Sequence, residues 1–326
     1  MAIKVQKPGL ATSVQDLGRP GYYDVGIPLS GALDRFALRC ANMLVGNEEG
    51  AAALECTFLG PELLFTTPAV LAVTGAELPP KVDGVAQPTW TSFAIEAGQV
   101  LSFDFLKRGA RAYLAVSGGI DVPVVLGSRS TYALGGLGGY EGRPLKAGDD
   151  VAVGEAAGNP SPGASIPEHL RRGAVPSPTL RMLPGLYEHR VTPEASKRFF
   201  ADTWKVAPEA DRIGYRFRGG APLSFVERTP PFGAGSDPSN IVDSCYPYGS
   251  IQVPGGTEPI VLHRDAVSGG GYFMLGTVIS ADMDFIGQLQ PHSKIQFVPV
   301  DMAAALAARR ERGGVLEAVR HHLGLV

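Results

Sequence analysis

Glycine and proline recur along the whole chain and divide it into short segments, which limits the possible folds more than any other feature. The 326 residues include 42 glycines and 27 prolines. Glycine permits left-handed turns, and proline interrupts both helices and central strands. Since 44% of the residues are hydrophobic and the glycines are not periodic, the chain is neither disordered nor collagen-like. Many turns between short extended runs predict a mainly β protein.

Short apolar runs bounded by Gly, Pro or Asp predict strands in both halves of the chain. These runs are residues 63–65, 69–73, 100–105, 112–116, 151–153, 180–183, 251–253, 259–263, 273–278 and 294–300.

Residues 33–45 have apolar side chains at helical spacing and predict one amphipathic helix in the first half. Ser30 is the expected N-cap, because its hydroxyl can accept a free N–H of the first turn. Gly46 stands where a left-handed residue is expected to end the helix.

Two further helices are expected in the second half. One begins at Thr192, with a proline suited to its first position. The Ala/Arg-rich tail, residues 302–323, predicts a helix that Gly313 and Gly314 interrupt.

The length allows two ordinary domains, each with its own core. Residues 158–178 are rich in Gly, Ala, Pro and Ser and have no sustained period, which is typical of a linker. We therefore predict domains at residues 1–157 and 179–326.

Charge and cysteine content exclude several classes of protein. The net charge is −3 and the pI is about 6.1, without the basic stripe of a nucleic-acid binder. Cys40, Cys56 and Cys245 lack metal-site spacing, and their odd number favours a reducing compartment. The histidines are scattered, so no metal site is expected. The N-terminus shows no signal peptide and no apolar run is long enough for a membrane span, so we predict a soluble cytoplasmic protein.

Two Gly-rich clusters in the first half carry arginines. Residues 13–34 include Arg19, whose guanidinium matches a carboxylate or carbonate. Residues 127–132 include Arg129 and Ser130, which can hold an anion. The structural alternatives are a loop with Arg19 in an ion pair, and a bridge between two strands at Arg129.

Two more clusters lie in the second half. Residues 211–216 can contribute to a site or form an ordinary strand whose Asp211 and Arg212 are solvated. In residues 237–272, Asn240 and Gln252 each offer a donor and an acceptor, which suits an amide substrate. The alternative for this last cluster is a tight turn between strands.

The clusters belong to longer motifs that cover nearly the whole chain in one order. The motifs are residues 9–34, 54–57, 60–61, 73–76, 113–120, 126–132, 211–216, 249–254 and 269–272. In these stretches the chain resembles the allophanate hydrolase subunit 2 family, also called the KipA-like family, to which the C subunit of 5-oxoprolinase belongs. The same module also forms part of the carboxyltransferase region of urea carboxylase and urea amidolyase.

The resemblance implies two tandem cyclophilin-like β-barrel domains with a few short helices. It also implies a partner, an allophanate hydrolase subunit 1 homologue of the same type as the B subunit of 5-oxoprolinase, and an enzyme component that is active only with partners. The chemistry would be biotin-dependent carboxyl transfer to a small amide, or ATP-dependent hydrolysis of 5-oxoproline. The chain has no biotin attachment motif and no ATP-grasp region, so a biotin carrier protein, a biotin carboxylase or another chain would supply carboxybiotin and ATP chemistry.

The resemblance also suggests roles for individual residues. Before Gly-Gly-Tyr the family commonly has a stretch like Ala-Asp-Arg-Gln-Thr-Thr, and this chain departs from it at residues 263–269. Residues 237–246 are instead similar to the urea carboxylase version, which favours a urea-like or other small amide over 5-oxoproline. The expected catalytic residues are Asn240, Arg19, Arg129 and Asp265. The expected substrate-binding residues are Gln252, Ser130, Arg212, Tyr215, Gly270 and Tyr272.

In this hypothesis Arg19 or Arg129 binds the carboxylate, Asn240 and Gln252 bind the acceptor amide, and Asp265 accepts a proton. The alternative function is a regulatory protein that antagonises a kinase inhibitor by binding a subunit 1 homologue.

Overall fold

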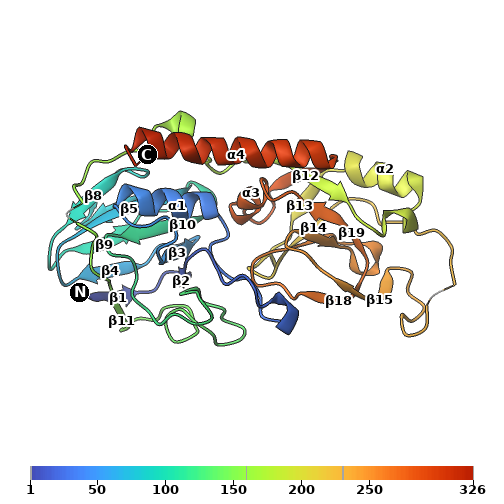
Figure 1. The fold of residues 1–326 in the computed structure, drawn as a ribbon, viewed down its shortest axis with the longest axis horizontal. Helices are drawn as coiled ribbons and strands as arrows, with labels where there is room; N and C mark the ends of the chain where they lie inside the picture. Colours follow the sequence, from blue (N-terminus) through green and yellow to red (C-terminus); the bar gives the residue numbers. More distant parts are fainter. Residues whose placement is uncertain (1, 159, 230, 326) are drawn as a thin grey trace. The chain divides into compact units, whose positions relative to one another are not determined.

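The computed structural model describes residues 2–158, 160–229 and 231–325, and it shows a mainly β chain with few helices (Figure 1). Its contacts divide it into two compact units. Unit 1 comprises Met1–Arg19, Ser30–Ala174 and Gly313–Val326, and unit 2 comprises Pro20–Leu29 and Val175–Arg312. The division after Ala174 falls within the segment predicted as a linker. Residues 20–29 interrupt the part of the sequence that forms unit 1 but group with unit 2. Residues 313–326 follow the part that forms unit 2 but group with unit 1.

Unit 1 contains two sheets, whose strand orders are β11-β1-β4-β9-β6-β7 and β2-β3-β10-β5-β8. The bounds of the strands are β1 Ala2–Lys7, β2 Ala11–Gln15, β3 Ala53–Thr57, β4 Glu62–Phe65, β5 Ala69–Glu77, β6 Pro80–Val82, β7 Val85–Ala86, β8 Ser92–Ile95, β9 Val100–Phe103, β10 Arg108–Val116 and β11 Asp150–Ala152.

The alternation of side chains along strand β5 gives unit 1 two cores. Leu71 and Val73 join the core that includes residues of both sheets, whereas Val70 and Ala72 pack in a second core with helix α1 (Arg35–Leu44). This follows from the period of two in a strand, where neighbouring side chains point to opposite faces.

Helix α1 begins later than predicted. Its N-cap is Asp34, whose carboxylate accepts a hydrogen bond of 2.9 Å from the Ala37 N–H. Ser30 was the wrong choice of cap, because it lies four residues earlier and has a left-handed backbone with φ 51°. Gly46 does have the predicted left-handed conformation, with φ 72°.

Unit 2 is built on a closed barrel with the strand order β12-β19-β16-β17-β14-β13-β20, and β15 and β18 form a separate two-stranded ribbon (Figure 1). The bounds are β12 Thr179–Pro184, β13 Trp204–Val206, β14 Gly214–Arg218, β15 Asn240–Cys245, β16 Ser250–Gln252, β17 Ile260–Leu262, β18 Gly269–Tyr272, β19 Met274–Val278 and β20 Lys294–Pro299. Helices α2 (Pro193–Ala201) and α3 (Met283–Gly287) also belong to this unit, and Thr192 caps α2 as predicted.

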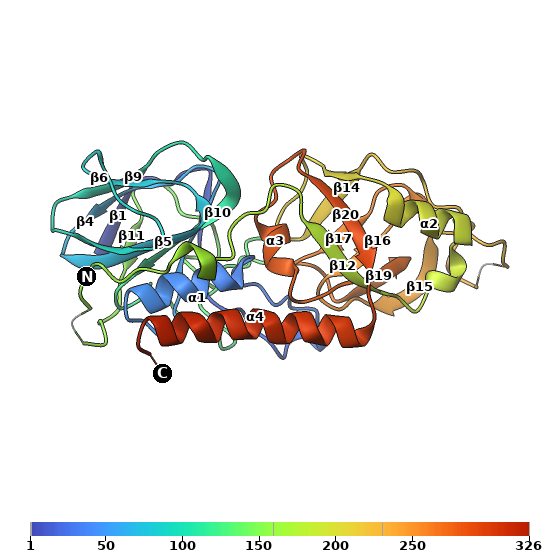
Figure 2. The same cartoon turned by 90° about the horizontal axis from the view of Figure 1, so that it is seen from above.

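The tail forms a single helix, α4 (Met302–His322). The predicted break at Gly313 and Gly314 is wrong, because the helix runs through both glycines. Glycine costs a helix about 1 kcal/mol relative to alanine but does not stop it. Within unit 1, Leu316 and Val319 pack in the core that contains α1, and Figures 1 and 2 show this end of α4 beside α1.

Every apolar run predicted as a strand overlaps a strand of the structure. Among the helices of the described residues, none combines the length and the apolar character that crossing a bilayer requires.

We expect one thiol of the folded protein to react readily with a disulfide reagent at pH 8, against three after unfolding. Cys245 is exposed, whereas Cys40 and Cys56 are buried. Burial raises the pKa of the Cys56 thiol to about 12, so Cys56 stays protonated and unreactive, since the thiolate is the nucleophile. Thiol titration with and without denaturant measures both counts, and a Cys245→Ser variant should abolish the fast phase. A fast-reacting thiol that remained in that variant would show that Cys40 or Cys56 is accessible and would contradict their burial.

Candidate functional site

Asp16 organises the arginine-containing loop of unit 1. It directly follows β2, and its carboxylate accepts hydrogen bonds from the Ser128 hydroxyl at 2.7 Å, the Ser130 hydroxyl at 2.5 Å and the Arg129 N–H at 2.6 Å. The Gly18 N–H donates a fourth bond at 2.7 Å. Asp16 is only 8% exposed, so these donors replace the water that an ionised carboxylate needs.

The two arginines predicted to bind a carboxylate differ in burial. Arg19 is fully buried, and its Nη2 donates to the Ser130 carbonyl. Arg129 is partly exposed, and its guanidinium donates to the Val122 carbonyl at 2.8 Å and to Asp121 at 2.9 Å. The burial of Arg19 favours a supporting role behind the loop, whereas Arg129 is placed where a ligand can reach it.

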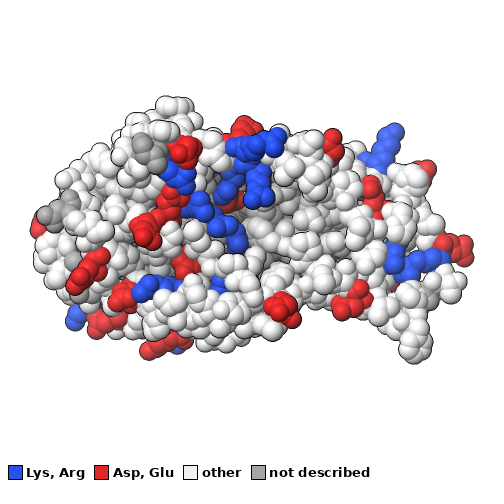
Figure 3. All heavy atoms as spheres, in the orientation of Figure 1, with Lys and Arg blue, Asp and Glu red and all other residues white. Residues whose placement is uncertain are grey.

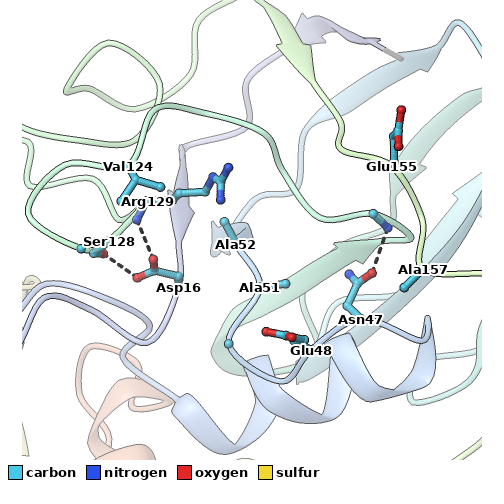
Figure 4. Close-up of a pocket in the computed structure, with 13 residues that line it drawn as sticks. Asp16, Asn47, Glu48, Ala51, Ala52, Val124, Ser128, Arg129, Glu155 and Ala157 are labelled. Carbon is cyan, nitrogen blue, oxygen red and sulfur yellow. Dashed lines mark hydrogen bonds between the residues drawn. The ribbon is translucent and has the colours of Figure 1, made fainter.

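Arg129 lines a pocket of about 440 Å³ in unit 1, a size typical of small-molecule sites. Figure 4 shows its guanidinium and the Glu48 and Glu155 carboxylates around this space, with Asp16 held by Ser128 and by the Arg129 backbone. One cation and several carboxylates can bind a polar ligand that both accepts and donates hydrogen bonds.

The pocket wall depends on a close approach of two backbone segments at Gly118. This residue has φ 92°, and a Cβ placed on it would lie 2.2 Å from the Gly154 carbonyl oxygen. We therefore expect Gly118→Ala to lower the free energy of unfolding by roughly 3 kcal/mol, since the backbone must shift as well as bear the left-handed strain.

Gly127→Ala is the matched control for Gly118→Ala. Gly127 lines the same pocket with φ 75°, but a Cβ placed on it would meet no atom within 4 Å, so only the backbone strain of about 1–2 kcal/mol applies. Thermal denaturation of both variants gives the comparison. Equal losses would show that the contact with Gly154 is unimportant.

In unit 2 the amide-bearing residues gather around Tyr246. Asn240 on β15 lies opposite Tyr272 on β18. The Tyr246 hydroxyl donates to the Tyr272 carbonyl at 2.9 Å and accepts from the Tyr272 N–H at 2.7 Å. The Gln252 side chain lies near the Tyr246 hydroxyl, where it lowers the pKa of Tyr246 and partly offsets the effect of burial. Burial raises the pKa of Tyr246, so the phenol stays protonated and keeps this arrangement at neutral pH.

The Asn240 side chain differs from its neighbours, since it makes no hydrogen bond to any side chain or backbone group of the described residues. Its amide is therefore available to a ligand, with both a donor and an acceptor. Gly270 lies beside this group, and a Cβ on it would stand 3.1 Å from the Tyr246 ring, so glycine here allows the strand and the ring to approach closely.

Arg212, Asp265 and Tyr215, also of unit 2, make contacts of their own. The Arg212 guanidinium donates to the Asp265 carboxylate at 2.8 and 3.3 Å, so the alternative in which Arg212 is solvated is wrong. The two hydrogen bonds tie the Asp265 carboxylate to Arg212, which suits Asp265 to an anchoring role better than to proton transfer. Tyr215 is fully buried against the His263 ring, which favours a role in the barrel core.

The structure thus brings the predicted residues together in three groups: Arg19, Arg129 and Ser130; Asn240, Gln252, Gly270 and Tyr272; and Arg212 with Asp265. Sequence reasoning missed the connecting residues Asp16 and Tyr246. Asp16 was present in the first Gly-rich motif, but only its hydrogen bonds to a loop more than a hundred residues away reveal its role.

Among the residues that the structure describes, no group of three or more His, Cys, Asp or Glu side chains is placed to bind a metal ion. On the face drawn in Figure 3, acidic and basic side chains are interspersed and most of the surface is uncharged.

Comparison with protein families gives a match over residues 25–299 to the family described as "Carboxyltransferase domain, subdomain A and B". The chain is 36% identical over 310 residues to the C subunit of 5-oxoprolinase from Escherichia coli, with 95% of each chain covered. It is 35% identical over 320 residues to the urea amidolyase of Saccharomyces cerevisiae, covering 95% of this chain and 17% of that protein.

Solved structures agree with these relatives. The urea amidolyase of Kluyveromyces lactis superposes with a TM-score of 0.91 at 34% identity, covering 98% of this chain and 20% of that one. The structure of TTHA0988 gives a TM-score of 0.77, also at 34% identity, over 91% of this chain and 55% of that one. The chain therefore spans about a fifth of the length of the urea amidolyases it matches and nearly all of the 5-oxoprolinase subunit.

Proposed function

Because this chain belongs to the carboxyltransferase domain family, with subdomains A and B, we propose that it is the carboxyltransferase component of a multi-subunit enzyme that acts on a small amide. The amide is urea-like or 5-oxoproline, the groups named by its relatives. The observation that carries the proposal beyond the family is the cluster around Tyr246, which offers the amide of Asn240 to a ligand.

Asn240 and Gln252 are proposed to orient the acceptor amide. A primary amide side chain can accept from a substrate N–H and donate to its carbonyl at the same time. Tyr272 lies opposite Asn240 on the paired strand, and Tyr246 holds its backbone with two hydrogen bonds. Tyr272 would therefore restrict the orientations that the acceptor amide can adopt beside Asn240. Fixing the nitrogen in one orientation is worth a large part of the rate of a transfer reaction.

Arg129 is proposed to bind a carboxylate, with Arg19 and Ser130 supporting its loop. Carboxybiotin, when bound, would supply an activated carboxyl group for transfer, and the pocket of about 440 Å³ with one partly exposed guanidinium fits such a group. A partner carrier would bring the biotin, and a partner chain would use ATP. A subunit 1 homologue is the expected direct partner, since the E. coli relative is by its name one subunit of its enzyme.

The finer fold assignment, two tandem cyclophilin-like domains at residues 1–157 and 179–326, is part of the same proposal. The closed barrel of unit 2 and the paired sheets of unit 1 support it. A cytoplasmic location likewise stays a prediction.

The proposal is tested by co-expressing the chain with a subunit 1 homologue, a biotin carboxylase and a biotin carrier protein. ATP turnover is then measured with urea, 5-oxoproline and a panel of small amides. Turnover that depends on one amide and on this chain would support the proposal and identify the acceptor. A stable complex with the subunit 1 homologue and no turnover with any amide would favour the regulatory alternative.

A further inference from the structure

Two arginines of unit 2 that no motif contains, Arg190 and Arg228, lie close together without a carboxylate. Neither forms an ion pair with any acidic residue that the structure describes. Other arginines of unit 2 do form ion pairs with carboxylates, for example Arg181 with Asp282 and Arg216 with Glu258. Two like charges held together in this way favour binding of an anion.

Backbone pairing places the two arginines side by side. Val191 pairs with Phe225 in an antiparallel bridge, and the Val226 N–H donates to the Arg190 carbonyl at 2.8 Å. Arg228 is two residues beyond Val226, so it is the diagonal neighbour of Arg190, within reach of a long side chain. Burial and the positive charge of Arg228 lower the pKa of Arg190 below its ordinary value, which agrees with this proximity.

Both guanidiniums are held in position but keep donors unused. Arg190 stacks over the Tyr187 ring, with 4.7 Å from its guanidinium carbon to the ring centroid, and its Nη1 is buried without a hydrogen-bond partner. Arg228 donates from Nη2 to the Asn240 carbonyl at 2.8 Å and makes no other side-chain hydrogen bond to the described residues. A guanidinium has five N–H donors, so most of those on Arg228 remain available.

We propose that Arg190 and Arg228 form a binding site for a small oxyanion that carries two negative charges, a dicarboxylate or a phosphate. Such an anion would neutralise both guanidiniums and accept the bonds that their forks can donate. The site adjoins Asn240, but it goes beyond the proposed transfer reaction, because binding here requires neither a partner subunit nor turnover.

The test is calorimetric titration of the chain with malonate, and separately with inorganic phosphate, at constant ionic strength maintained with chloride. We expect saturable binding that weakens at least about tenfold in Arg190→Gln and in Arg228→Gln, as for loss of one charged hydrogen bond. Arg198→Gln is the control, since Arg198 is an exposed arginine on helix α2 of the same unit, and it should bind like the wild type. Tighter binding of malonate would identify a carboxylate ligand, and tighter binding of phosphate a phosphate ligand.

Arg190→Lys and Arg228→Lys keep the positive charge and guard against misfolding of the glutamine variants. They should bind with intermediate affinity, and malonate or phosphate should raise the melting temperature of the wild type and of Arg198→Gln more than that of either glutamine variant. The proposal is overturned if neither anion binds more strongly than chloride, or if both glutamine variants bind as tightly as Arg198→Gln. Failure of the carboxyl-transfer assay would leave this result unaffected.

Discussion

Replacing Asn240 by alanine is expected to reduce amide-dependent turnover of the assembled enzyme by about 100-fold, the typical effect of losing one preorganised polar contact to the reacting group. Asn240 is half-buried and ends in an amide that makes no hydrogen bond within the described part of the chain, so its removal costs the fold no hydrogen bond. The effect should therefore appear in kcat with little change in melting temperature. Steady-state ATP turnover at saturating amide measures it.

Two further variants separate this role from damage to the ribbon. Val242→Ala changes an exposed side chain on the same strand, β15, and should keep wild-type turnover. Asn240→Asp keeps the shape but lacks the N–H donors, so it should be nearly as impaired as the alanine variant if the residue donates to the acceptor carbonyl. Full activity of Asn240→Ala would remove Asn240 from the site.

Asp16→Ala is expected to lower the free energy of unfolding of unit 1 by about 3 kcal/mol. The substitution removes the carboxylate that accepts from two buried serine hydroxyls and from two partly buried backbone N–H groups, and a buried unsatisfied group costs about 1–3 kcal/mol. Denaturant titration in a Trp204→Phe background measures this loss, because Trp90 of unit 1 is then the only tryptophan.

The matched comparison for Asp16→Ala is Ser128→Ala, which removes one donor and keeps the carboxylate. It should cost about 1 kcal/mol. Asp16→Ala should also weaken the binding of a carboxylate by Arg129, because the Asp16 carboxylate accepts a hydrogen bond from the Arg129 backbone N–H. If Asp16→Ala and Ser128→Ala were equally stable, the carboxylate would not organise the loop.

Local patterns were enough to predict most of the regular structure. The apolar runs at residues 69–73 and 294–300 form strands as predicted, because a short apolar run and the residues that bound it, such as Pro68 and Asp301, act within a few residues. Thr192 was found as a cap for the same reason. The errors lie where several local alternatives compete. Asp34 caps helix α1 instead of Ser30, because the backbone of Ser30 is left-handed and belongs to the preceding turn. The helix propensities of Gly313 and Gly314 are low but do not interrupt α4.

The chemistry of the candidate sites depended on contacts that chain order does not reveal. The amino-acid sequence by itself determined the β-rich class, the turns and the motifs that place the chain in its family, because these depend on neighbouring residues. Only the tertiary structure decided that Arg212 pairs with Asp265, that Asp16 holds the loop of Arg129, and that Arg190 lies beside Arg228. A charged group takes its role from whichever charges and dipoles surround it in space, and folding brings these from distant parts of the chain.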